Sequence, residues 1–166
     1  SDYVVGKQKI DPLPVPGLEL DTFAAAISNE RAGQHTYTNR LILFFLIGRR
    51  EMFDQIGGIC ESYGRWGFED DDLSIRANAA GWQLRIAGDC FISHIGSQTA
   101  KTAQLNYDAL LLKNWEVFKA KWGLPMDLPY GPYNPAEILA QSFTPEQLYV
   151  SYDKGQSTDT PLRLIS

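Results

Sequence analysis

The feature that most constrains this chain is a run of four acidic residues, 69–72 (EDDD), which follows closely on Gly67. Four consecutive carboxylates repel one another, and the N-terminus of a helix stabilises negative charge through its free amides and its dipole. Apolar residues then recur at helical spacing until Gly81, a typical helix stop. The sequence therefore predicts a helix over about 69–80 that presents ionised oxygens at the lip of a glycine-containing loop.

Strand-like and helix-like segments alternate along the rest of the chain. The run 41–47 (LILFFLI) has no polar alternation, which is typical of a strand buried on both faces. All the expected strands lie at 2–10, 41–47, 82–87, 90–95, 147–152 and 161–165. The other expected helices lie near 21–27, over 49–56 and 101–122, and from Pro135. This alternation indicates an α/β fold, with a mixed sheet and flanking helices.

Charge and length exclude several classes of protein. The 166 residues carry 15 Lys and Arg against 20 Asp and Glu, a formal net charge of −5. No basic stripe is present to neutralise phosphates, so we expect no nucleic-acid partner. The apolar run 41–47 is far shorter than the about 20 residues that a membrane-spanning helix needs. No transmembrane segment is therefore expected.

Cysteine usage bears on the compartment. The chain contains two cysteines, Cys60 and Cys90, which are not in Cys-x-x-Cys spacing. Two cysteines are too few for a disulfide scaffold, so both are interpreted as reduced thiols. The chain also opens without a charged-then-apolar export signal. These features predict a cytoplasmic protein.

Taken by itself, the acidic run has three interpretations. The carboxylates can simply cap a helix and remain solvated. A calcium loop of the EF-hand type is disfavoured, because its ligands alternate and need a glycine at the sixth position. A carboxylate pair for glycoside hydrolysis needs a second carboxylate across the sugar, which the sequence does not place.

Several segments, in this order, resemble the C-terminal half of a GT-A-fold glycosyltransferase of the family 2 type. They are FLIGRREMF at 45–53, IGG at 56–58 with Glu61, WGFEDDDLSIR at 66–76, AGW at 80–82, and His94. The pattern WGxEDxDL within them is also similar to the β-1,4-galactosyltransferases. The resemblance implies a partial, Rossmann-like GT-A domain. Its acceptor-side half would occupy residues 1–125, and a Pro/Tyr-rich extension, residues 126–166, would pack on it or lead to another domain.

The resemblance also implies an activity and roles for five residues. Such enzymes transfer a sugar from a nucleotide-sugar donor to a hydroxyl of a glycan or other acceptor, with inversion at the anomeric carbon. Asp70 would be the general base, and Glu69 would orient the acceptor or donor sugar. Trp66 and Gly67 would shape the acceptor site, through an indole face that stacks on sugar and a backbone that allows close approach. His94 would help to bind a divalent metal, Mn²⁺ or Mg²⁺.

The two remaining carboxylates of the run have simpler expected roles. Asp71 stands at a variable position of the motif and is expected to be solvated. Asp72 precedes Arg76 by four residues, a spacing that predicts an ion pair within the helix.

The chain departs from the family in three respects. No Asp-x-Asp precedes the acidic run. Ile59 and Cys60 stand where family members often have Phe-Asp, and Phe91 stands where the galactosyltransferases have a methionine metal ligand. We therefore expect the nucleotide-binding half to be missing, and inefficient turnover by this chain alone. Two alternatives stay open. One is a non-catalytic carbohydrate-binding or assembly module that uses the tyrosines of the extension, and the other is a hydrolase in which water accepts the sugar.

Overall fold

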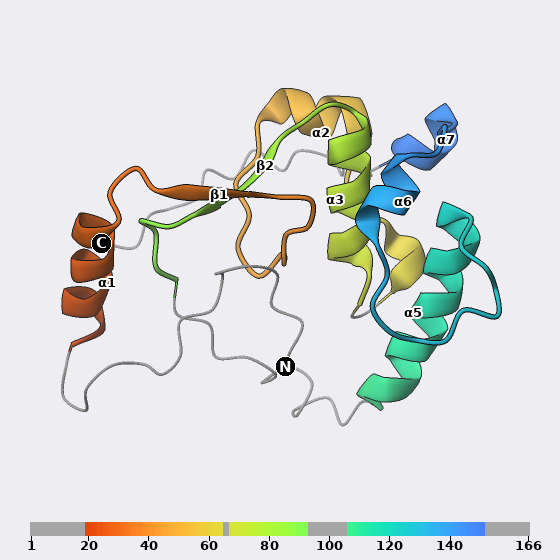
Figure 1. The fold of residues 1–166 in the computed structure, drawn as a ribbon, viewed down its shortest axis with the longest axis horizontal. Coiled ribbons are helices and arrows are strands. Elements are labelled where there is room, and N and C mark those ends of the chain that lie inside the picture. Colours follow the sequence, from red (N-terminus) through yellow and green to blue (C-terminus); the bar gives the residue numbers. More distant parts are fainter. Residues whose placement is uncertain (1–18, 65–66, 93–105, 152–166) are drawn as a thin grey trace, which may run out of the picture.

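The computed structural model describes residues 19–64, 67–92 and 106–151 (Figure 1). Helices dominate these ranges, together with one pair of short strands. In chain order the elements are α1 (Leu20–Glu30), β1 (His35–Thr38), α2 (Arg50–Ile56), the 3-10 helix η1 (Glu61–Tyr63), α3 (Glu69–Ala79), β2 (Leu84–Ala87), α5 (Tyr107–Trp122), α6 (Pro135–Leu139) and α7 (Pro145–Leu148).

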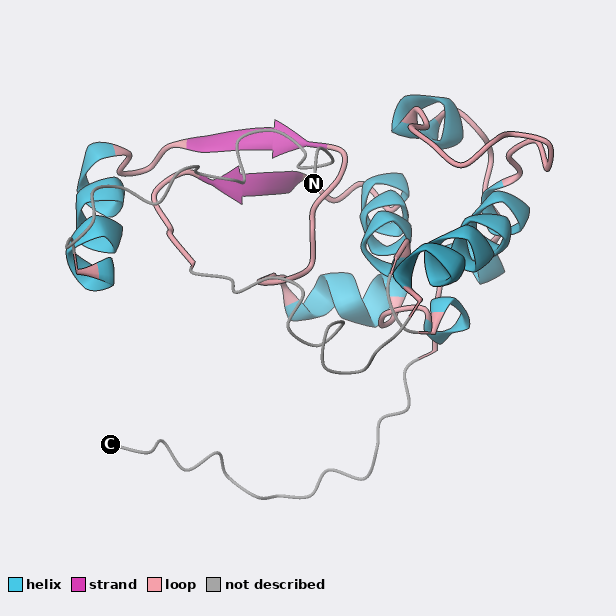
Figure 2. Cartoon of the chain, turned by 90° about the horizontal axis from the view of Figure 1, so that it is seen from below, coloured by secondary structure: helices cyan, strands magenta, loops and turns pink. Residues whose placement is uncertain are grey.

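The sheet of the described ranges has two antiparallel strands, β1 and β2, in a register that places His35 opposite Ala87 and Thr38 opposite Leu84. Figures 1 and 2 both show this pair between α1 on one side and the remaining helices on the other. The expected strand at 82–87 is confirmed as β2. A mixed sheet was predicted, and the described residues form this small antiparallel one instead.

The prediction of a buried strand at 41–47 is wrong. The segment contains turns and irregular backbone, and Ile47 is 84% exposed. A strand buried on both faces must pair its amides and carbonyls with neighbouring strands. Within the described ranges β1 and β2 pair with each other, and no strand lies beside 41–47. Its first residue, Leu41, instead donates its amide to Ser74 Oγ of α3 at 3.0 Å.

The predictions for α2, α3 and α5 are confirmed, with boundaries that differ by one residue in α2 and α3. Of the helix predicted over 101–122, residues 101–105 lie outside the described ranges. The helix expected near 21–27 is α1, and the one expected from Pro135 is α6. Towards the C-terminus, the segment expected to be strand-like at 147–152 contains the end of α7 and a single bridge from Val150 to Gly57. Residues 90–92 form no strand. The other expected strand residues, 2–10, 93–95, 152 and 161–165, lie outside the described ranges.

Helix α3 contributes to both hydrophobic clusters of the core. One cluster surrounds Trp115, Phe118 and Trp122 of α5 and includes Ile75 of α3. The other joins α2 and β2 and includes Leu73 of α3. Because α3 is packed on both sides, its two ends are held at fixed positions in the fold.

Both cysteines are free, Cys60 in the core and Cys90 at the surface. None of the helices in the described ranges has the length and the apolar character that crossing a bilayer requires.

The glycine that ends α2 is the contact point for the C-terminal part of the chain. Gly57 has φ of 76°, and a Cβ built there would lie 1.7 Å from the carbonyl oxygen of Val150. Gly58 donates to that same oxygen at 3.0 Å. No side chain fits between the two backbones.

We predict that Gly57→Ala lowers the free energy of unfolding by more than about 1 kcal/mol, since it combines an unfavourable φ with a backbone clash. Urea unfolding measures the loss. Gly131→Ala is the matched control, because nothing lies within 4 Å of a Cβ at that position. Equal midpoints for the two variants would contradict the prediction.

Candidate active site

The acidic run lies at the N-terminus of α3, as predicted, and an unusual backbone leads into it. Phe68, the residue before the helix, has φ of 74°, and no other non-glycine residue of the described ranges has a positive φ. Such a conformation costs about 1–3 kcal/mol and is found where surrounding packing enforces it. The Phe68 ring supplies that packing, with ring centroids 5.3 Å from Trp115 and 5.0 Å from Phe118.

Gly67 is fitted tightly between the acidic run and α5. Its φ is 99°, and a Cβ there would lie 2.5 Å from Leu111 Cδ2. Its carbonyl accepts a hydrogen bond from Asn114 Nδ2 at 3.3 Å. The close approach expected at Gly67 is therefore made, within this chain, to a neighbouring helix.

Asp72 is fully buried and holds three elements together. It pairs with Arg76 Nε at 2.7 Å, as predicted, and with Lys121 Nζ of α5 at 2.6 Å. It also accepts the Tyr63 hydroxyl of η1 at 3.1 Å. The guanidinium of Arg76, equally buried, donates to the carbonyls of Ile56 at 2.6 Å and Gly58 at 2.7 Å. Asp72 is therefore a structural residue.

The prediction that Asp71 is solvated is wrong, because its side chain is buried. Arg40 Nη2 donates to its carboxylate at 2.9 Å, and the Tyr133 hydroxyl donates to it as well. Burial raises the pKa of Asp71 to about 7, which the Arg40 guanidinium opposes and the charge of Asp70 reinforces. Its partners lie 31 and 62 residues away in sequence, so a local pattern could not reveal them.

The first two carboxylates, Glu69 and Asp70, are left at the open end of the helix. Both are partly exposed, and within the described ranges neither forms an ion pair. Asp70 Oδ1 accepts the amide of Asp71 at 2.9 Å, which orients the carboxylate. The structure thus separates the acidic run into two structural residues and two that remain available to a ligand.

The Glu69 carboxylate has an unsatisfied oxygen. Oε2 is buried and finds no hydrogen-bond partner among the described residues. Burial is the main cause that raises the pKa of Glu69, and the charge of Asp70 raises it further. Hydrogen bonds from the backbone amides of Glu69 and Gly67 oppose this increase. A buried acceptor without a donor is costly, and a substrate hydroxyl placed there would remove that cost.

The fold adds Tyr107, the first residue of α5, to this end of α3. Its ring is about half exposed. Partial burial raises the pKa of Tyr107, and the nearby charges of Glu69 and Asp70 raise it further. No local sequence pattern indicates this residue, since only the packing of α5 brings it near the carboxylates.

Two of the predicted site residues, Trp66 and His94, lie outside the described ranges. Phe91, at the position of the family's methionine ligand, offers no ligand atom, and its ring packs against Phe23 at 5.0 Å between centroids. The described residues contain no group of three His, Cys, Asp or Glu side chains placed to hold a metal. They do not by themselves form the metal site that the resemblance implies.

The raised pKa of Asp71 gives a prediction about stability. Between its ordinary value of 3.8 and about 7, the folded state holds a proton that the unfolded state releases. The contribution of Asp71 to the free energy of unfolding is therefore complete below the lower value and is lost as the pH rises through the upper one. We predict that Asp71→Asn reduces the fall in this free energy between about pH 5 and about pH 8.

Urea unfolding of the wild-type chain and of Asp71→Asn at both pH values measures this difference. Asp127→Asn, at an exposed aspartate, controls for the loss of a negative charge. Parallel pH dependences in the wild type and Asp71→Asn would contradict the assignment.

Comparison with known families agrees with the site's sequence motifs. Residues 43–96 match the family model described as the N-terminal domain of galactosyltransferase. The match includes α2, the acidic run with α3, and β2. No curated protein matches the chain, and neither does any solved structure. The family match supports a glycosyltransferase-related domain over these residues, without distinguishing the family 2 type from others.

Proposed function

We propose that this chain is the acceptor-side half of an inverting glycosyltransferase of the GT-A type, with Asp70 as its general base. One observation carries the proposal. In a segment that matches a galactosyltransferase model, the buried carboxylates of Asp71 and Asp72 are paired with Arg40 and Arg76, while Asp70 and Glu69 are left open at the helix end. Helix capping alone does not explain why the buried oxygen of Glu69, Oε2, has no hydrogen-bond partner among the described residues.

The proposed chemistry begins with the acceptor hydroxyl, which is a weak nucleophile. The Asp70 carboxylate accepts the hydroxyl proton while the oxygen forms a bond to the anomeric carbon of the donor. The bond from that carbon to the nucleotide diphosphate breaks on the opposite face, which inverts the configuration. The Asp71 amide holds one Asp70 oxygen, and the other is available for the proton.

Glu69 is proposed to position the substrate. Its unsatisfied Oε2 would accept a second hydroxyl of the acceptor or donor sugar, which fixes the ring relative to Asp70. A residue that orients a substrate needs a rigid support, and the first turn of α3 provides one for Glu69. Stacking of a sugar on Trp66 and close approach at Gly67 belong to the same proposal.

A divalent metal held with the help of His94 is also part of the proposal. Mn²⁺ or Mg²⁺ would offset the charge that develops on the leaving diphosphate. A site with three His, Cys, Asp or Glu ligands would have to include at least one residue outside the described ranges. We likewise propose that donor binding depends on strands outside this sequence, because no Asp-x-Asp precedes the acidic run. A cytoplasmic location stays a prediction.

The alternative of a non-catalytic module that binds glycans through the tyrosines of 126–166 has less support. Tyr133 donates its hydroxyl to Asp71, and its ring lies 4.9 Å from Phe118 between centroids. Phe143 packs against Trp122 at 5.5 Å. These rings are committed to the packing of the extension on α3 and α5.

We predict that Asp70→Asn, in the full-length gene product, lowers kcat for sugar transfer by about 10²–10⁴-fold, because it removes the proton acceptor. Donor affinity should stay nearly unchanged. Product formation from a panel of labelled sugar nucleotides measures transfer, and calorimetry measures donor binding. Asp127→Asn is the matched control, and full transfer by Asp70→Asn would refute the proposed base. Release of free sugar instead of glycoside would indicate the hydrolase.

We predict that His94→Ala weakens the activation of transfer by Mn²⁺, because it removes an imidazole ligand. The measurement is a Mn²⁺ titration of initial rate in the full-length product after treatment with a chelator. His35→Ala serves as control, since His35 is exposed and its ring packs on Tyr37. Superimposable titrations of His94→Ala and wild type would remove His94 from the proposed site.

A further inference from the structure

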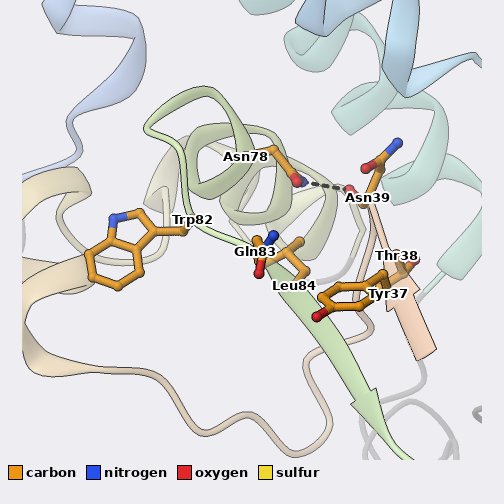
Figure 3. Close-up of a pocket in the computed structure, with 7 residues that line it drawn as sticks. All are labelled: Tyr37, Thr38, Asn39, Asn78, Trp82, Gln83 and Leu84. Carbon is orange, nitrogen blue, oxygen red and sulfur yellow. Dashed lines mark hydrogen bonds between the residues drawn. The ribbon is translucent and has the colours of Figure 1, made fainter. Parts of the chain in front are cut away.

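A cleft of about 370 Å³ lies at the other end of α3, away from the acidic run. We call it the polar cleft and define it by residues 37–39, Asn78 and 82–84. The C-terminal end of β1 forms one wall, and the turn from α3 into β2 forms the other (Figure 3). The proposed mechanism at the acidic run does not involve these residues.

The lining of the polar cleft is polar and uncharged. Its residues include three with side-chain carboxamides, Asn39, Asn78 and Gln83, and two aromatic residues, Tyr37 and Trp82. Figure 3 shows the Trp82 ring pointing away from Tyr37. Carboxamides can both donate and accept hydrogen bonds, which suits hydroxyl groups. Aromatic faces suit the apolar face of a sugar ring. None of the lining residues carries a formal charge, and the Arg85 guanidinium lies beside two of them, Tyr37 and Gln83.

The groups that would touch a ligand are held in place by contacts that leave them accessible. Trp82 Nε1 donates to Gln55 Oε1 at 2.8 Å, which satisfies the indole and fixes its ring. Tyr37 is 56% exposed, and the Arg85 guanidinium lies 4.8 Å from its ring centroid. Figure 3 shows the Tyr37 ring reaching from its strand toward Gln83 and Leu84. Prepositioned rings lose little conformational entropy on binding.

The amides of the cleft differ in the hydrogen bonds that they already make. Gln83 Oε1 accepts a hydrogen bond from Arg85 Nη2 at 3.4 Å. Asn78 Nδ2 donates to the backbone carbonyl of Asn39 at 3.0 Å and to that of Ser74 at 2.7 Å. This leaves Asn78 Oδ1 as an acceptor. The Asn39 side chain is exposed and makes no hydrogen bond within the described ranges.

The cleft is tied to the acidic end by one segment of backbone that follows α3. Asn39 contacts Asn78, Leu41 contacts Ser74 and Arg40 contacts Asp71, so residues 39–41 run along the helix. Asp70 and Asn78 are eight residues apart on α3, which corresponds to about 12 Å along the axis. A monosaccharide at Asp70 would not reach the cleft, whereas an oligosaccharide could extend to it.

We infer that the polar cleft binds neutral saccharide, and that it holds the part of an oligosaccharide acceptor remote from the reacting hydroxyl. The second half of this inference rests on the proposed function. Saccharide binding in the cleft does not depend on Asp70, so this inference and the proposed function can be tested separately.

The test uses the full-length gene product and an array of neutral oligosaccharides built from glucose, galactose, mannose and N-acetylglucosamine, with sialylated and sulfated glycans beside them. We expect binding to neutral glycans, weakened about tenfold by Tyr37→Ala through loss of the stacking surface. Asn39→Ala, which breaks no hydrogen bond of its own side chain within the described residues, should weaken it as well. Tyr149→Ala is the matched control, because Tyr149 is similarly exposed and lies beyond α7.

Transfer kinetics separate this inference from the proposed function. Tyr37→Ala should raise KM for an oligosaccharide acceptor and leave KM for a monosaccharide unchanged, while Asp70→Asn should lose transfer and keep array binding. If Asp70→Asn transfers normally but Tyr37→Ala loses array binding, the proposed base fails and the cleft stands. Three results would each refute saccharide binding in the polar cleft. Both cleft variants could bind the array as the wild type does, the wild type could prefer charged glycans, or the wild type could bind no neutral glycan.

Discussion

The buried ion pair between Asp72 and Arg76 is the interaction on which the rest of this structure depends. Its two side chains reach the end of α2, the 3-10 helix η1 and helix α5 through hydrogen bonds and a second cation, Lys121. A buried pair is tolerated only when its remaining donors and acceptors are satisfied, and removing one partner costs about 3–5 kcal/mol. Because these partners come from three elements, the pair fixes the position of α3 within the fold.

The same pair determines how the acidic run is used. Each residue along a helix turns about 100° from the last, so four consecutive side chains cannot share one environment. Asp72 turns toward Arg76 and the core, and Asp71 turns toward Arg40 and Tyr133. Glu69 and Asp70 stay at the open end. One short motif therefore supplies both the anchors of the helix and the carboxylates that it presents.

The sequence predicted what depends on neighbouring residues. Helices α2, α3 and α5 follow from apolar spacing and terminal glycines, and the Asp72–Arg76 pair follows from a separation of four residues. The predictions that were wrong concern residues whose contacts lie far away in the sequence. The run 41–47 has the composition of a buried strand, but a strand needs neighbours that its own residues cannot specify. Asp71 is buried because Arg40 and Tyr133 reach it from elsewhere in the chain. Tyr107 and the polar cleft likewise exist only through packing.

The cations that neutralise the buried carboxylates of Asp71 and Asp72 also matter for the proposed chemistry. Uncompensated charge on Asp71 and Asp72 would repel a nucleotide diphosphate. Arg40, Arg76 and Lys121 lie against these two groups and offset that charge. Asp70, the proposed base, lies at the helix end beside Glu69, and neither forms an ion pair within the described ranges. The same rigid helix carries Asn78 at its far end, so the residues that stabilise α3 also set the separation between the proposed base and the polar cleft.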